Sequence, residues 1–193
     1  DYYEDGWHGT WKMDGGVLSQ QAIHHLDALN YLLGPIKSVV TKSSRRINKL
    51  EAEDTIVSIF NNSDGSTGTF EATTAARPKD IEASLSITGE KGFINIGGIA
   101  LNKLIDIQFL NQKNKTSILC NKYSETVKNG YGISHRLLIQ GNIDVLSGKK
   151  NNHLVYAKDC ISTTNLVHAF YESNEKKQWI FLKNKPMYKK LGS

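Results

Sequence analysis

Residues 9–27 read Gly9-Thr10-Trp11-Lys12-Met13-Asp14-Gly15-Gly16-Val17-Leu18-Ser19-Gln20-Gln21-Ala22-Ile23-His24-His25-Leu26-Asp27. From this stretch onward, apolar residues recur every three or four positions, at Leu18, Ala22, Leu26, Leu29 and Leu33. That spacing places them on one stripe of an α-helix. Gly34-Pro35 follows directly, and proline disfavours helical conformation in the residue before it. The sequence therefore predicts a helix over residues 17–33.

A second stripe on this predicted helix is polar and consists of Gln20, His24, Asp27 and Tyr31. His24 and Asp27 are three residues apart, so the carboxylate can orient one ring nitrogen of the imidazole. The other nitrogen is then free to exchange a proton with a bound substrate. A histidine on a helix is more often structural than catalytic, so the spacing alone leaves both interpretations open.

After Pro35 the apolar pattern changes to strict alternation, which is typical of β-strands. Short turns rich in Gly, Asn and Asp separate the alternating segments, and this favours an antiparallel meander over βαβ units. The predicted strands cover residues 36–46, 52–61, 65–74, 82–88, 92–96, 104–110 and 116–119.

Helical spacing returns over residues 134–147 and 155–173. A run of strands flanked by helices indicates an α+β fold. We expect one large, open, mainly antiparallel sheet with the helices packed on one face. The 193 residues suffice for one such domain, so we expect residues 1–193 to form a single domain.

Composition excludes several classes of protein. The formal net charge is +5, but the lysines are scattered, which disfavours nucleic-acid binding. No apolar stretch is long enough to predict a membrane span. Cys120 and Cys160 lie in no metal-binding or disulfide pattern, so we expect reduced thiols, a cytoplasmic protein and no metal site. The start on Asp1, without an initiator Met, suggests a fragment whose missing part lies upstream.

The segment from Gly9 to Asp27 resembles the glycine-rich loop and His-x-x-Asp helix of the glucose–fructose oxidoreductase / inositol dehydrogenase (Gfo/Idh/MocA) family. The Gly9-Thr10-Trp11 start is most similar to the branch that oxidises UDP-N-acetylglucosaminuronate. Ser134-His135-Arg136 resembles the family's (Gly/Ser)-His element, and residues 169–173 resemble its closing helix. The resemblance covers essentially the whole chain, in order.

The resemblance implies the C-terminal substrate domain of a two-domain enzyme. NAD or NADP is bound mainly by an N-terminal Rossmann domain, which also supplies a catalytic lysine; this chain contains neither. The resemblance further implies that hydride passes from a ring carbon of a sugar or nucleotide sugar to the nicotinamide, and that this fragment alone is inactive.

The resemblance and the helix geometry together assign roles to particular residues. His24 is the predicted catalytic acid/base. Gly15 and Gly16 are predicted near the cofactor, since glycine lets the backbone approach a ligand closely. Many family members have Asp at the position of Gln20 and Gly at that of Ala22. The predicted substrate-binding residues are Gln20, Asp27, Trp11, Thr10, His135 and Arg136, although Trp11 could instead pack between domains and His135 could serve only as a helix-start residue.

A second function from another class stays open at this point. The chain could be a non-catalytic sugar-binding or oligomerisation module with the same fold. In either case, the helix-free face of the sheet needs covering, and the resemblance implies a homodimer or homotetramer formed through that face. No nucleic-acid or membrane partner is expected.

Overall fold

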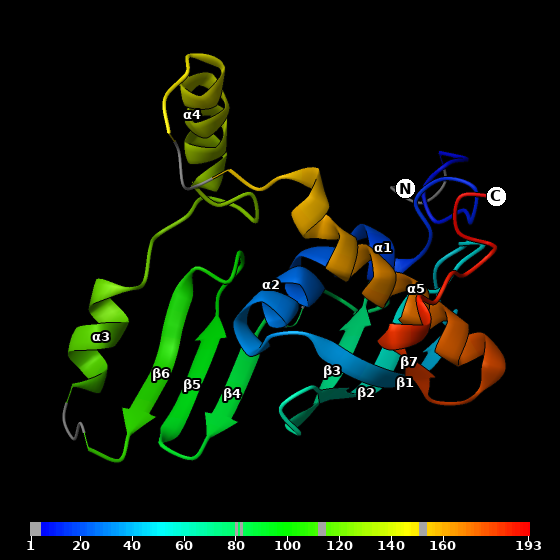
Figure 1. Ribbon diagram of the computed structural model, residues 1–193, viewed down its shortest axis with the longest axis horizontal. Coiled ribbons are helices and arrows are strands. Elements are labelled where there is room, and N and C mark those ends of the chain that lie inside the picture. Colours follow the sequence, from blue (N-terminus) through cyan, green and yellow to red (C-terminus); the bar gives the residue numbers. More distant parts are fainter. Residues whose placement is uncertain (1–4, 80, 82, 112–114, 151–153) are drawn as a thin grey trace. The chain divides into compact units, whose positions relative to one another are not determined.

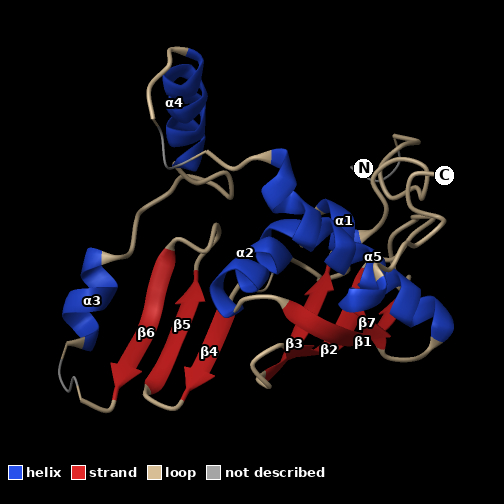
Figure 2. Ribbon diagram, in the orientation of Figure 1, coloured by secondary structure: helices blue, strands red, loops and turns tan. Residues whose placement is uncertain are grey.

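The structure, a computed structural model, describes residues 5–79, 81, 83–111, 115–150 and 154–193. The chain divides into two compact units. Unit 1 comprises residues 1–80 and 156–193, and unit 2 comprises residues 81–155. Each unit contains one sheet and its own helices (Figures 1 and 2).

The sheet of unit 1 has four strands in the order β3-β2-β1-β7, all antiparallel to their neighbours. Alternation of apolar residues produces this sheet because every second side chain points to the same face. On β2, Ile56, Ser58 and Phe60 are buried, whereas Val57 and Ile59 between them are about half exposed. The strands are β1 (Ile36–Ser44), β2 (Thr55–Asn62), β3 (Thr67–Thr73) and β7 (Ile180–Phe181).

The buried face of this sheet packs against α5 (Ile161–Lys176), which follows the short 3-10 helix η1 (Ala157–Cys160) (Figure 1). Phe170 of α5 is fully buried and meets the ring of Phe70 edge to face, with centroids 5.7 Å apart. Ser173 on the same helix accepts a hydrogen bond from the amide of Thr41 at 3.0 Å. This one helix therefore supplies much of the core of unit 1.

The helix predicted over residues 17–33 is present but interrupted. It forms as α1 (Val17–Gln20) and α2 (Ile23–Leu33). The amides of both Gln21 and Ala22 donate to the carbonyl of Val17, at 3.1 and 2.8 Å. The second of these bonds spans five residues, which widens the turn and ends the regular α-helical ladder.

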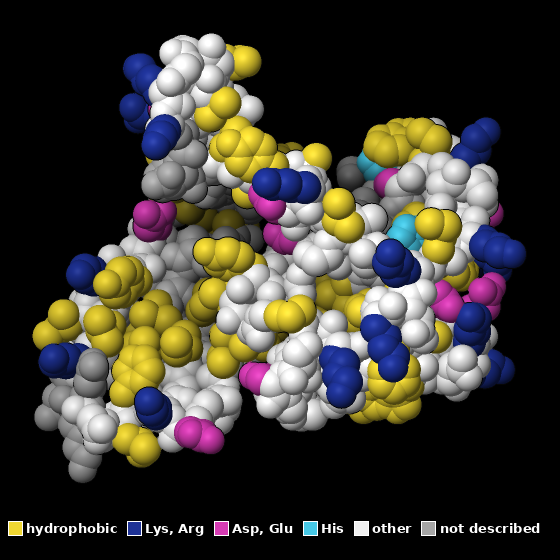
Figure 3. All heavy atoms as spheres, in the orientation of Figure 1, with side chains coloured by type: hydrophobic (Ala, Val, Ile, Leu, Met, Phe, Trp, Pro, Cys, Tyr) yellow, Lys and Arg dark blue, Asp and Glu magenta, His cyan; other side chains and the backbone are white. Residues whose placement is uncertain are grey.

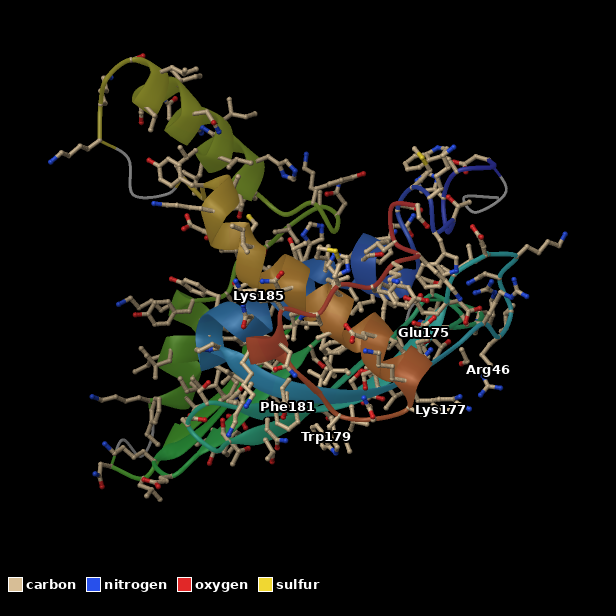
Figure 4. All side chains as sticks on the ribbon, turned by 45° about the vertical axis from the view of Figure 1, so that its right-hand side comes forward. Arg46, Glu175, Lys177, Trp179, Phe181 and Lys185 are labelled. Carbon is tan, nitrogen blue, oxygen red and sulfur yellow. The ribbon has the colours of Figure 1, made fainter. Side chains whose placement is uncertain are left out.

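Two features of unit 1 were not predicted. The last helix continues to Lys176, beyond the expected end at residue 173. The chain then turns back to form β7 on the edge of the sheet, followed by η2 (Leu182–Asn184). Trp179 and Phe181 are each 39% exposed along this edge. Figure 4 labels them together with Lys177 and Lys185 on the same stretch of chain.

Unit 2 contains a three-stranded antiparallel sheet in the order β4-β5-β6. Its elements are β4 (Leu85–Gly89), β5 (Gly92–Gly97), β6 (Lys103–Phe109), α3 (Thr116–Lys122) and α4 (Ser134–Leu146). The expected strand over residues 116–119 was wrong, because this segment begins α3. The Thr116 hydroxyl donates to the carbonyl of Ile107 at 2.7 Å, which ties the helix to β6.

Unit 2 has little interior of its own. Among its described residues, only Gly97 and Gly141 are buried. Figure 3 shows hydrophobic side chains gathered over its strands, and Ile105 on β6 is 58% exposed. Apolar surface of this kind is usually covered by a partner or ligand.

The α+β class with open antiparallel sheets is confirmed. The strands expected in one sheet are distributed over the two sheets of units 1 and 2. None of the described helices is both long and apolar enough to cross a membrane.

Candidate functional site

The glycine-rich loop before α1 is anchored to the segment that leads into β2. The carbonyl of Gly9 accepts hydrogen bonds from the amides of Glu51 and Ala52, at 3.0 and 2.9 Å. The amide of Trp11 donates to the Glu51 carboxylate at 3.0 Å. Gly9 has a φ of +74°, and a Cβ there would lie 2.3 Å from Leu50. Glycine is required at this point because both the backbone conformation and the space exclude a side chain.

Glu53 holds the start of α1 from inside the unit. Its backbone carbonyl accepts from Val17 N at 2.9 Å, and its Oε1 accepts from Leu18 N at 3.0 Å. The Tyr171 hydroxyl, from α5, donates to the same Oε1 at 3.0 Å. The first amides of a helix have no partner within the helix, so this carboxyl group satisfies one of them and joins α1 to α5.

Burial raises the pKa of Glu53 to about 7, and this effect exceeds the opposing influence of the hydrogen bonds from Leu18 and Tyr171. The negative charge of neighbouring Asp54 acts in the same direction as burial. The pKa in the fold thus lies above the ordinary value of 4.5. The stabilisation gained from the protonated group is therefore complete below about pH 4.5 and is lost as the pH rises through 7.

Gln20 lies at the end of α1, and its side chain is bound within the loop. Its Nε2 donates to Asp14 Oδ2 at 2.6 Å, while Asp14 Oδ1 accepts from the amide of Gly9 at 2.7 Å. The Oε1 of Gln20 is buried and has no partner among the described residues. Asp14 therefore fixes the amide orientation of Gln20, and one buried acceptor remains free.

His24 lies in the first turn of α2 with its side chain exposed, while Leu26 two positions later is fully buried. His25 is half-buried, and burial, followed by the charge of His24, lowers its pKa. The two adjacent histidines thus occupy different environments. His24 is accessible to a ligand, and His25 packs against the unit.

The side chain of Asp27 is hydrogen bonded to Thr163 on α5. Its Oδ1 accepts a hydrogen bond from the Thr163 hydroxyl at 2.5 Å. This contact connects α2 to the start of α5, and a carboxylate used in this way ties two helices together. The predicted role of Asp27 in orienting His24 or binding substrate stays a prediction.

Trp11 and Thr10 both make contacts inside unit 1. The Trp11 ring meets Tyr171 and Tyr188 edge to face, at centroid distances of 5.1 and 5.3 Å. The Thr10 hydroxyl donates to the carbonyl of Trp7 at 2.8 Å. These contacts hold the loop against α5 and the C-terminal segment, and the predicted substrate contacts of Trp11 and Thr10 stay predictions.

Gly15 and Gly16 are buried against the protein itself. Their amides donate to the carbonyl of Thr10 at 2.8 Å and to the Tyr171 hydroxyl at 3.3 Å. A Cβ on Gly16 would lie 2.2 Å from the Glu53 carboxyl group. The space beside both glycines is filled by protein, and their amides are already hydrogen bonded. These contacts give both glycines a packing role, and their predicted place near the cofactor stays a prediction.

His135 and Arg136 lie at the start of α4 in unit 2, and both are exposed. The His135 ring approaches Tyr131 edge to face with centroids 5.9 Å apart. A shallow hollow next to the start of this helix is lined in part by Asn102, Tyr123 and Ser134. The predicted contact of His135 and Arg136 with substrate stays a prediction.

The sequence interpretation missed Asp14 as the partner of Gln20, and Glu53 and Tyr171 as the residues that hold α1. One signal was available. Glu53-Asp54 places two acidic residues directly before an alternating apolar strand, where charged side chains are buried only if they have partners.

Comparison with known proteins identifies relatives of this fold. The family model of the GFO/IDH/MocA C-terminal domain matches residues 1–95. WlbA dehydrogenase structures from Bordetella pertussis and Chromobacterium violaceum, both in complex with NADH and UDP-GlcNAcA, are each 28% identical over 93% of this chain. Their TM-scores are 0.78 and 0.79, and the match covers 49% and 50% of those chains. The chain therefore spans about half the length of these relatives.

A structure of levoglucosan dehydrogenase in complex with NADH and levoglucosan shares the fold, at 19% identity, a TM-score of 0.62, and coverage of 87% of this chain and 50% of that one. A comparison with curated proteins gives no match. The architecture is that of the C-terminal α+β domain of nicotinamide-dependent dehydrogenases. Residues 1–95 thus match the C-terminal domain of the GFO/IDH/MocA family, and over 93% of the chain the fold is similar to that of the WlbA dehydrogenases.

Proposed function

We propose that this chain is the substrate-binding half of an NAD(P)-dependent oxidoreductase that acts on a sugar or nucleotide sugar, with a UDP-N-acetylglucosaminuronate-like compound as the first candidate. The observation that carries the proposal is the 28% identity, over 93% of the chain, to dehydrogenases in complex with NADH and UDP-GlcNAcA. The exposed His24 on α2 supports it, because a proton acceptor must be accessible to the substrate.

His24 removes the proton from the hydroxyl group that is oxidised. The Asp14–Gln20 pair holds an amide group four residues before His24, where the amide can position a neighbouring hydroxyl. An amide does not ionise, so Gln20 orients the substrate and moves no proton. A bound nicotinamide would supply the hydride acceptor for the ring carbon.

The rest of the enzyme would come from a preceding Rossmann domain, which would supply most of the contacts to NAD or NADP. Residues 1–193 together would form the substrate-binding and oligomerisation part, inactive alone and working in the cytoplasm. The outer face of the unit 1 sheet supports an oligomeric form, because Val57 and Ile59 leave apolar surface on it. A homodimer or homotetramer would cover that face.

A non-catalytic module is the second candidate, and one observation favours it. Gln20 and Asp27, two of the polar groups predicted to bind substrate, are engaged by Asp14 and Thr163. Polar groups that already form hydrogen bonds within the protein are less available to a ligand. Such a site could bind a sugar weakly or only support assembly.

The two candidates are separated by turnover in the full-length protein, expressed with the polypeptide encoded upstream. We expect the absorbance of reduced nicotinamide to rise with NAD and UDP-N-acetylglucosaminuronate, and to rise more slowly with UDP-N-acetylglucosamine, glucose or inositol. A folded protein that binds NAD and turns over none of these compounds would favour the non-catalytic module.

A further inference from the structure

The carboxyl group of Glu53 is the point at which three parts of unit 1 meet. It contacts Leu18 on α1 and Tyr171 on α5, and it is itself part of the segment that enters β2. Glu53 is only 3% exposed. Its Oε2 is buried without a partner among the described residues and lies beside Gly16.

We propose that Glu53 is a positioning residue: by holding the first turn of α1 against Tyr171, its carboxyl group determines where Gln20 and His24 lie. The consequence for Gln20 as a substrate-positioning residue and for His24 as the proton acceptor rests on the proposed function. The placement of α1 itself does not.

The contacts around Glu53 lead directly to the candidate site. Tyr171 also accepts a hydrogen bond from Gly16 N and lies 3.0 Å from the Ser19 hydroxyl, the residue before Gln20. The Ser19 hydroxyl donates in turn to the carbonyl of Asp14 at 2.5 Å. Because α1 has only four residues, its own hydrogen bonds are too few to fix its position. The external contacts through Glu53 and Tyr171 must do so.

Asp54 is a natural control for this role. It is adjacent in sequence and also fully buried. Its carboxylate, however, accepts from the amides of Arg46, Ile47 and Asn48 in a different loop. Replacing Asp54 therefore removes hydrogen bonds within the same unit but none to the start of α1.

The test is hydrogen exchange on the whole protein, followed by mass spectrometry of peptides covering residues 17–22 and 46–48. Glu53→Ala should raise exchange over residues 17–22 about tenfold or more relative to the rest of unit 1. Tyr171→Phe, a milder change, should raise it in the same peptide. Glu53→Gln retains an acceptor oxygen for both donors and should restore protection. Asp54→Asn should affect residues 46–48 instead.

The proposal is overturned if Glu53→Ala and Tyr171→Phe change residues 17–22 no more than Asp54→Asn does, and it is equally overturned if Glu53→Gln fails to restore protection. In the turnover assay, Glu53→Ala should lower kcat about tenfold while KM for NAD stays within about twofold. Exchange needs no turnover, so an inactive protein would contradict the proposed function and still leave the role of Glu53 measurable.

Discussion

Replacing His24 with alanine in the full-length protein is expected to lower kcat for the preferred sugar substrate by about 10²–10⁴, the usual contribution of a positioned acid or base. The imidazole is exposed in the first turn of α2, so its removal should cost little stability. KM should change much less than kcat, because the lost interaction matters most in the transition state. Steady-state kinetics under NAD saturation measures both values.

His25→Ala is the matched control for this result. The same side chain is removed one position away, but His25 is half-buried, and its pKa is lowered by that burial. We expect its kcat to stay within about threefold of the parent value, with the loss appearing in stability instead. Equal kcat in His24→Ala and the parent protein would move the acid/base role to another residue.

Replacing Gly16 with alanine is expected to destabilise unit 1 by about 3 kcal/mol or more. The added Cβ would lie 2.2 Å from the carboxyl group of Glu53 and 2.3 Å from its backbone oxygen. The φ of Gly16 is −101°, which alanine adopts easily, so the whole effect comes from crowding. Urea unfolding followed by tryptophan fluorescence measures it, since Trp11 packs on Tyr171 beside the site.

Gly130→Ala is the control for this substitution. Its Cβ would meet nothing closer than the Ile99 carbonyl, at the ordinary contact distance of 3.6 Å. We expect a change within about 0.5 kcal/mol. If Gly16→Ala unfolds at the same urea concentration as the parent, Glu53 does not lie against Gly16 as the structure shows.

The strands of the meander were predictable because alternation and turn residues act locally. The ends of β1 and β3 lie within two residues of the expected ends. Residues 116–119 were predicted wrongly because four residues carry too little periodicity to distinguish strand from helix. In the structure this segment begins α3, which the hydrogen bond from Thr116 to the carbonyl of Ile107 ties to β6. The two-residue strand β7 has no pattern of its own and exists through its pairing with β1.

The candidate site was only partly predictable for a similar reason. The polar stripe with His24 follows from helical spacing within a few residues. The partners of that stripe do not, because Asp27 bonds to Thr163 on a distant helix and Glu53 bonds to Tyr171. Such contacts join residues more than a hundred positions apart. Buried acidic groups are moreover the exception in proteins, so composition alone would place Glu53 on the surface.

In the proposed function, the exposed histidine on α2 acts on the substrate. The most direct measurement is a crystal structure of the full-length protein with NAD and UDP-N-acetylglucosaminuronate. We predict a ring nitrogen of His24 within about 3.2 Å of the hydroxyl oxygen that is oxidised. A sugar bound productively at the nicotinamide, with His24 more than about 6 Å from that oxygen and another proton acceptor in its place, would contradict the account.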